Sequence, residues 1–167
     1  LKILMVLLFF TGCEQKDDTE IFVLENKTQT DVKRIKQQFE AVNLTDAFLK
    51  EAFKVKWNQY EVIDNSDGSL TYEFSTNLRS KLHLVDDSIV KSKNTKKIFS
   101  VYKLLAIESQ DGSLSFEILK FTGNNNKELK EISLSDLLDF NGAINYSTPE
   151  GTYIKDEIYN YGILTNS

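Results

Sequence analysis

Two different spacings of hydrophobic residues divide this chain, and the change falls near Trp57. On the N-terminal side, apolar residues recur three or four positions apart, as they do in an amphipathic helix. These residues are Val32, Ile35, Phe39 and Val42. Thr30 stands before them at the position of an N-cap, and Thr45 stands before a shorter run with helical spacing. The sequence therefore predicts two helices before Trp57, beginning near residues 30 and 45.

After Trp57, apolar and polar residues alternate, which is typical of half-buried strands. Residues 70–75 alternate strictly after an Asp-Gly step at 67–68, and glycine takes the positive φ that a tight hairpin turn requires. The most apolar run, residues 98–107, is expected to lie centrally in the sheet. A last hairpin is predicted over residues 143–161.

The Asp-Gly hairpin has a second copy later in the chain. Residues 63–74 read IDNSDGSLTYEF and residues 107–118 read IESQDGSLSFEI. Either a hairpin was duplicated, or two hairpins converged on the same turn chemistry. We favour convergence, because everything the two segments share is what a hairpin needs in any case.

Strand patterns outnumber helical ones over residues 30–167. We therefore predict a single α+β domain, in which the N-terminal helices pack on one face of a mostly antiparallel, meandering sheet. The chain has 167 residues, of which 41% are hydrophobic and 27% charged, as in an ordinary globular domain with one core.

Charge and cysteine content exclude several classes of protein. The formal net charge is −5, and the basic residues are scattered among acids, which argues against a nucleic-acid partner. A single Cys forbids an intramolecular disulfide and a Cys-rich zinc module.

The first twelve residues, LKILMVLLFFTG, form a segment of their own. Lys2 is followed by eight apolar residues from Ile3 to Phe10. This run is too short to cross a bilayer as a helix, which takes about 20 residues, but it matches the hydrophobic region of a secretory signal peptide. We predict a signal peptide over residues 1–12. The alternative is a buried apolar strand or helix at an ordinary N-terminus.

The end of this segment, FTGC at residues 10–13, resembles a bacterial lipobox, although Leu, Val or Ile is usual where Phe10 stands. In a lipobox a small residue precedes a Cys that becomes acylated and forms the new N-terminus. The resemblance implies that acylated Cys13 binds the membrane lipid, and residues 13–29 are then expected to form a flexible tether.

The tether begins with EQKDD, in which Lys16, Asp17 and Asp18 resemble the surface-export signal of Bacteroidota lipoproteins. That resemblance implies a lipid anchor in the outer membrane, with the protein facing the cell exterior. The alternative is a solvated charged tether of the kind any lipoprotein carries.

The order of elements also resembles a family. A helix, a hairpin that starts at a Trp, alternating strands and a closing stretch with Gly142, Gly151 and Gly162 are similar to the N-terminal region of uncharacterised Bacteroidota surface lipoproteins. This resemblance is diffuse and implies no active site.

Signals of catalysis are weak in this sequence. The only histidine, His83, alternates with Leu82 and Leu84, so it is expected to face solvent. The metalloprotease, dinucleotide-binding and Walker motifs do not occur. The DNSDG turn lacks the acid that an EF-hand loop requires at its first position. We predict that the protein is not an enzyme and has neither a cofactor nor a metal site.

Four tyrosines gather in the predicted last hairpin: Tyr146, Tyr153, Tyr159 and Tyr161. Tyr153, Tyr159 and Tyr161 share parity and therefore one face of an extended strand. An exposed face of this kind would form a flat platform for glycan rings or for a partner protein. The alternative is that the face packs in the core.

These observations predict a lipid-anchored outer-membrane surface lipoprotein that acts as a non-enzymatic binding or interaction module. Its expected partners are membrane lipid, through Cys13, and a glycan or a protein. Two alternatives stay open: a carboxylate-dependent hydrolase of extracellular polymers, and an accessory or scaffolding subunit of an outer-membrane complex.

Overall fold

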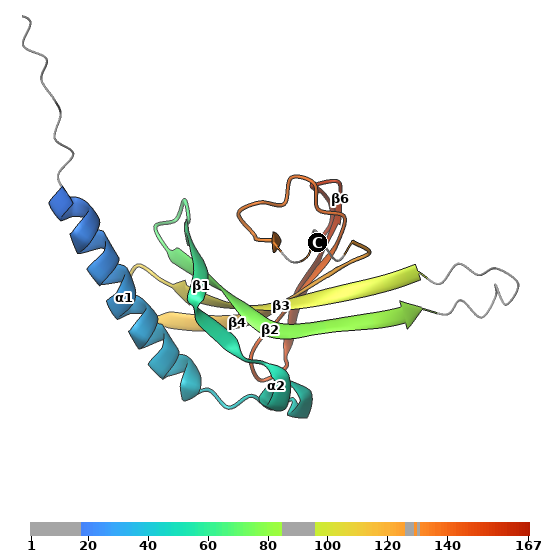
Figure 1. Ribbon diagram of the computed structural model, residues 1–167, viewed down its shortest axis with the longest axis horizontal. Coiled ribbons are helices and arrows are strands. Elements are labelled where there is room, and N and C mark those ends of the chain that lie inside the picture. The colour runs from blue at the N-terminus through green and yellow to red at the C-terminus, as the bar shows by residue number, and fades with distance from the viewer. Residues whose placement is uncertain (1–17, 85–95, 126–128, 130) are drawn as a thin grey trace, which may run out of the picture.

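The computed structural model describes residues 18–84, 96–125, 129 and 131–167, with side chains described from residue 29 onward except for residues 80–97. Two helices precede the sheet in this part of the chain: α1 (Asp18–Glu40) and α2 (Ala47–Ala52). Figure 1 shows α1 lying across one side of the strands, with α2 at its C-terminal end.

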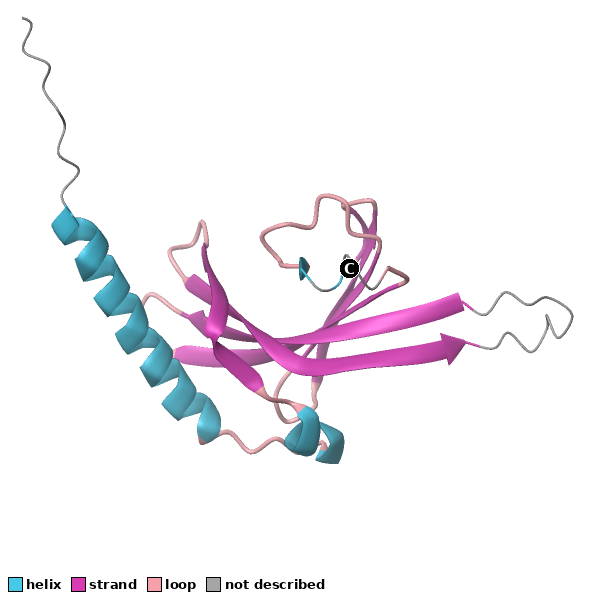
Figure 2. Cartoon of the chain, in the orientation of Figure 1, coloured by secondary structure: helices cyan, strands magenta, loops and turns pink. Residues whose placement is uncertain are grey.

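Seven strands form one antiparallel sheet in the order of the chain, β1 to β7. They are β1 (Val55–Asp64), β2 (Leu70–Leu84), β3 (Lys96–Glu108), β4 (Leu114–Gly123), β5 (Gly142–Ser147), β6 (Tyr153–Asn160) and β7 (Ile163–Asn166). Each strand pairs with its neighbour in sequence, so β1 and β7 are the two edges of a meander (Figure 2).

The predicted α+β class is wrong, because the protein is largely β. In the described chain, α1 and α2 hold 23 and 6 residues, beside the seven-stranded sheet. Helical spacing predicts where helices form but not how much of the core they cover. In the structure α2 has no buried residue, and Ile35 and Phe39 are the buried hydrophobic residues of α1 among its described side chains.

The helix boundaries also differ from the predicted ones. α1 begins at Asp18, so residues 18–29, predicted as part of a flexible tether, are helical. Neither Gly nor Pro occurs between residues 18 and 40, so no strong helix breaker opposes this extension. For α2 the N-cap is Asp46, whose carboxylate accepts a hydrogen bond of 2.8 Å from the Leu49 amide. The hydroxyl of Thr45, the predicted cap, instead donates to the Glu150 carbonyl.

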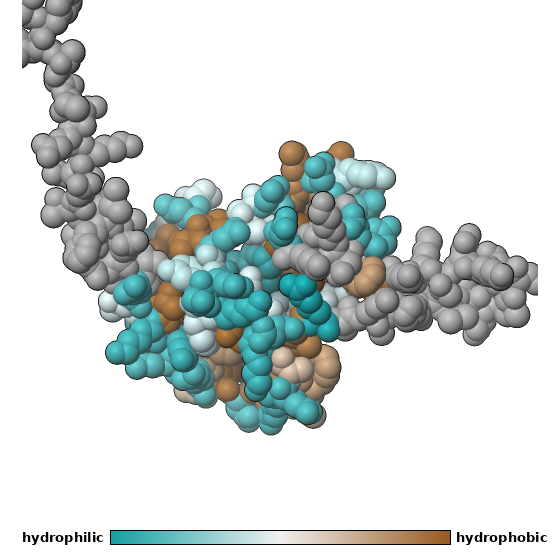
Figure 3. Space-filling model, viewed as in Figure 1, coloured by the Kyte–Doolittle hydropathy of each residue, from teal (hydrophilic) through white to brown (hydrophobic). Residues whose placement is uncertain are grey.

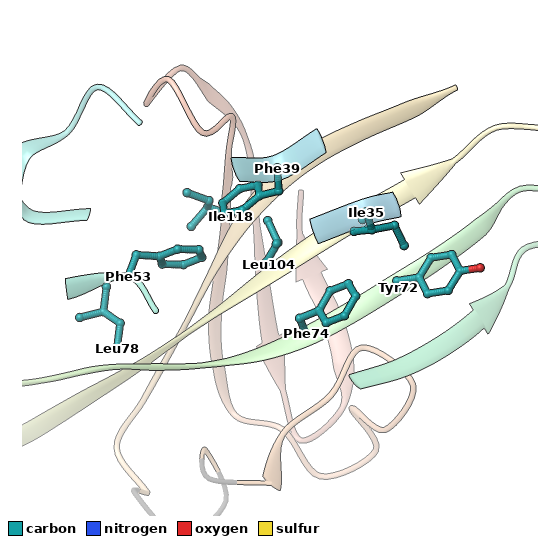
Figure 4. Packing of buried hydrophobic residues seen from close by; sticks show 9 residues of the cluster. Ile35, Phe39, Phe53, Tyr72, Phe74, Leu78, Leu104 and Ile118 are labelled. Atoms are coloured by element: carbon teal, nitrogen blue, oxygen red, sulfur yellow. The ribbon is translucent and has the colours of Figure 1, made fainter. Parts of the chain in front are cut away.

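One hydrophobic core lies between α1 and the sheet. Ile35 and Phe39 point from α1 toward Phe74, Leu104 and other buried side chains of the strands (Figure 4). The Phe39 ring meets the Phe116 ring edge-on, at 5.4 Å between centroids. Aromatic pairs of this geometry add about 0.5–1.5 kcal/mol beyond the burial of their area.

A second core lies on the opposite face of the same strands. Leu104 and Ile118 belong to the first core, whereas their neighbours Leu105 and Leu119 belong to the second. Alternate strand residues point to opposite faces, so the central strands are buried on both. Three residues of the connection between β4 and β5 cover this second face: Leu129, Ile132 and Phe140.

Three hairpin turns share one backbone geometry. In the β1–β2 turn the Gly68 amide donates to the Asn65 carbonyl, and the corresponding bonds recur at residues 109–113 and 148–152. The central glycines have φ values of 79°, 80° and 87°. The third turn, TPEGT, has this geometry without the DGSL sequence. That favours convergent turn chemistry over duplication as the origin of the two similar hairpins.

Candidate binding surface

The predicted N-terminal signals fall largely outside the described residues. Cys13, Lys16 and Asp17 all lie outside them. Asp18 is the first residue of α1, and its side chain is not among those described. The predictions of acylation and surface export therefore stay predictions.

Two of the four predicted tyrosines meet on the second face of the sheet. Tyr146 of β5 and Tyr159 of β6 both donate hydrogen bonds to Oε2 of Glu157, over 2.8 and 3.0 Å. Lys155 donates to Oε1 of the same carboxylate over 2.6 Å, and its Nζ lies 4.4 Å from the centroid of the Tyr146 ring. Glu157 thus joins both phenols and the ammonium in one cluster.

The environment of this cluster keeps the phenols protonated and the carboxyl ionised. Burial, followed by the hydrogen bond to Glu157, raises the pKa of Tyr159 to about 12, and the same causes raise the pKa of Tyr146 further. Burial opposes ionisation of Glu157, but hydrogen bonds from Lys155 and from both phenols outweigh it and lower the pKa of that carboxyl. The two hydroxyls are therefore engaged inside the protein.

Tyr153 does not share a face with Tyr159, so the parity argument is wrong. Tyr146 pairs with Lys155, whereas the next residue, Ser147, pairs with Tyr153. This β-bulge in β6 contributes one extra residue and reverses the alternation of side chains. Tyr153 therefore lies on the face of Ser147, opposite to the cluster around Glu157.

Tyr161 lies apart from the other tyrosines, outside the strands. It lies in the turn between β6 and β7 with a φ of 48°. Its side chain is 71% exposed and that of Tyr153 is 65% exposed, whereas Tyr146 is 6% exposed. The structure brings Tyr146 and Tyr159 together and leaves Tyr153 and Tyr161 apart on the surface.

Exposed hydrophobic side chains concentrate in the last hairpin. Nine large hydrophobic residues are exposed in the described chain, and six of them lie in β6, β7 and the turn between them. These six, which we name the C-terminal apolar surface, are Tyr153, Ile154, Ile158, Tyr161, Ile163 and Leu164. Figure 3 shows hydrophobic side chains at the surface at the top of the view, where β6 ends in Figure 1.

Sequence reasoning did not select the aliphatic members of this surface. Ile163 and Leu164 are neighbours, so they point to opposite faces of β7. β7 is an edge strand whose four residues are all exposed. Only the position of β7 in the sheet identifies these aliphatic residues as part of the surface.

A second polar cluster forms around two glutamates, Glu61 and Glu73. Glu73 of β2 is buried, and its carboxylate accepts from Nζ of Lys103 and from the Leu134 amide, the latter over 2.8 Å. Glu61, its cross-strand neighbour, accepts from the hydroxyls of Ser133 and Ser135 over 2.6 Å each.

The two carboxylates of this cluster differ in their access to solvent. Hydrogen bonds from Ser133 and Ser135 lower the pKa of Glu61, which is exposed. The side chain of Glu73 has no exposed surface and is ion-paired with Lys103. In this arrangement the two acids hold residues 133–135 against the sheet.

Within the described residues, no three His, Cys, Asp or Glu side chains come together as a metal site would require. No helix in the same part of the chain is both long and apolar enough to cross a membrane.

Comparison of the chain with protein-family models, with curated proteins and with solved structures gave no match.

Proposed function

We propose that this protein is a lipid-anchored outer-membrane surface lipoprotein that acts as a non-enzymatic binding module, and that it binds a partner protein through the C-terminal apolar surface. Two features support the proposal: the signal-like sequence through Cys13 and the concentration of exposed apolar residues on β6 and β7. The second feature carries it, because exposed apolar side chains gathered on one hairpin favour an interaction site.

The chemistry of the surface favours a protein over a glycan. Four of its six members are aliphatic, and its two tyrosines do not form a common platform. Burying apolar area contributes about 25 cal/mol per Å², whereas sugar rings are bound mainly by aromatic faces and hydrogen bonds. The unpaired edge of β7 also offers backbone groups to an extended segment of a partner.

The two edge strands, β1 and β7, differ in how readily a further strand can pair with them. β1 has an irregular register between Val55 and Tyr60 and carries charged residues, which are devices that discourage pairing at an edge. β7 reads ILTN and has no charge and no proline. A partner strand is therefore expected to add at β7 and not at β1.

Site-specific photo-crosslinking in intact cells tests the binding surface. A photoreactive residue at Tyr153 should give a discrete adduct, and one at the exposed Glu51 of α2 should give none. Replacing Ile158 and Ile163 with Ser should remove the adduct at Tyr153 while leaving the thermal midpoint of the purified domain within a few degrees. Adducts of equal yield at both positions, or an adduct unaffected by the Ser substitutions, would count against the proposal.

Two variants, one single and one triple, test the location separately. Cys13→Ser should release the protein from membranes, and unchanged membrane association would refute the lipid anchor. Replacing Lys16, Asp17 and Asp18 with Ala should abolish cleavage by external protease on intact cells. Replacing Glu25 and Lys27 with Ala is the matched control, and it should leave that cleavage unchanged.

A further inference from the structure

A hollow of about 340 Å³ opens between the C-terminal end of α1, α2 and the start of β1. In Figure 1 these three segments lie together at the lower end of the molecule. Phe39, Leu44, Val55 and Trp57 are among the residues that line it, together with the side chains of Lys50 and Lys54. Its volume lies within the range of small-molecule sites, about 300–1,000 Å³.

The aromatic lining of the hollow is held by the first core. The Phe39 ring lies 6.0 Å from the Trp57 ring, which in turn lies 5.1 Å from the Phe74 ring, centroid to centroid. Phe39 and Phe74 are buried, whereas Trp57 is half-buried. The lining is therefore formed in advance and keeps part of an indole ring open to a ligand.

The hollow exists because α2 bounds it without filling it. α2 has six residues, none of which is buried, and Phe48 is 52% exposed. The cap at Asp46 fixes where the helix begins. Leu49 and Ala52 of α2 are half-buried against the first core, and Lys50 of the same helix lines the hollow.

The charge around the hollow is positive. Lys50 and Lys54 are exposed and form no ion pair within the described part of the chain. The one acid in the lining, Glu40, lies 3.8 Å from Nζ of Lys36, which offsets its charge. A hollow lined by both apolar and polar groups, with two lysines that form no ion pair in the described chain, is complementary to an anion that has an apolar body.

We propose that this hollow binds a small organic carboxylate, with its hydrocarbon body against Trp57 and Phe39 and its carboxylate beside Lys50 and Lys54. A neutral molecule of the same shape would bury the same apolar surface but would lack the attraction to the lysines. A short anion would be attracted to the lysines but would bury little apolar surface. The site is separate from the C-terminal apolar surface and does not rest on the function proposed for it.

Intrinsic fluorescence tests this site directly, because Trp57 is the only tryptophan of the chain. Titration with octanoate should give a saturable change in Trp57 emission. Octanol, which has the same body without the charge, should bind roughly tenfold more weakly, since two exposed charge interactions are lost. Acetate should cause no saturable change. Equal affinity for octanoate and octanol would overturn the role of the lysines.

Variants separate this hollow from other apolar surfaces. Replacing Lys50 and Lys54 with Gln removes both charges, on side chains one bond shorter, and should weaken octanoate binding roughly tenfold, whereas Lys33→Gln on the exposed side of α1 should not. Leu44→Phe, which enlarges a lining residue, should weaken both octanoate and octanol. If Leu44→Phe fails to fold, the lysine variants still test whether octanoate binds at this hollow.

The C-terminal apolar surface provides the last control, with calorimetry as a readout that does not depend on Trp57. Replacing Ile158 and Ile163 with Ser should leave octanoate binding unchanged. Loss of binding in that variant, or full binding in the double lysine variant, would overturn the proposal.

Discussion

Glu73→Gln should strongly destabilise the protein, although the substitution changes almost no volume. The Glu73 side chain has no exposed surface, and that of its partner Lys103 is 9% exposed. Glutamine can still accept a hydrogen bond from the Leu134 amide, so the loss is mainly the negative charge that balances the buried ammonium. Removing one member of a buried ion pair typically costs 3–5 kcal/mol.

We therefore expect a decrease of about 3–5 kcal/mol in the free energy of unfolding for Glu73→Gln. For a domain of this size, 1 kcal/mol corresponds to roughly 2–4 °C, so the thermal midpoint should fall by about 10 °C.

Urea unfolding followed by Trp57 fluorescence measures the loss, with Glu40→Gln as the matched control. Glu40 pairs with Lys36 on the surface at 3.8 Å, and an exposed pair of this kind contributes at most about 1 kcal/mol. Converting Glu73 to Leu together with Lys103 to Met should recover most of the stability, less about 1–3 kcal/mol for the Leu134 amide left without an acceptor. A loss under 1 kcal/mol in Glu73→Gln would refute this account.

Three further expectations concern the last two strands. Gly162 has a φ of 76°, and a Cβ there would overlap the carbonyl oxygen of Leu138, so Gly162→Ala should lower the free energy of unfolding by more than about 1 kcal/mol in thermal melts. The pKa of Tyr159 is raised to about 12 and that of Tyr146 further, so the unfolded chain loses its phenolic protons first, and stability should fall as the pH rises above about 10. Urea midpoints at pH 9 and 11 measure this, and Tyr159→Phe should reduce the difference. The pKa of Glu157 is lowered, so its contribution is present above about pH 4.5 and lost as the pH falls through the lowered value. Glu157→Gln should flatten the acid side of the stability profile, and an unchanged slope would contradict the cluster.

Local signals in the sequence predicted local structure well. The glycines at 68 and 112 mark turns because positive φ is a property of single residues, and both turns are where the sequence placed them. The predicted burial of Ile35 and Phe39 on one helix face is confirmed. This feature is predictable because the spacing of apolar residues over a few turns defines the buried face of a helix.

What the sequence did not predict depends on pairing between distant segments. The bulge beside Tyr153 exists only relative to β5, so parity counted along one strand could not reveal it. The contact of Lys103 with Glu73 joins residues 30 positions apart, and neither residue carries a signal for burial on its own. The fold class was wrong for a similar reason, since helical spacing does not show how much of the core a helix covers. α2 has no buried residue, although Leu49 and Ala52 pack against the first core.

The sequential order of the strands has a consequence for the way the chain acquires its structure. Because each strand pairs with its neighbour in sequence, the chain can fold one hairpin at a time during synthesis. The turns after β1, β3 and β5 are short, whereas longer connections join β2 to β3 and β4 to β5. The first core needs nothing beyond β4, so α1 can dock as soon as residue 123 has emerged. The second core must wait for residues 129–146. Until then, one face of the newly made sheet stays uncovered, and this interval is when a nascent chain of this topology is most open to capture by a chaperone.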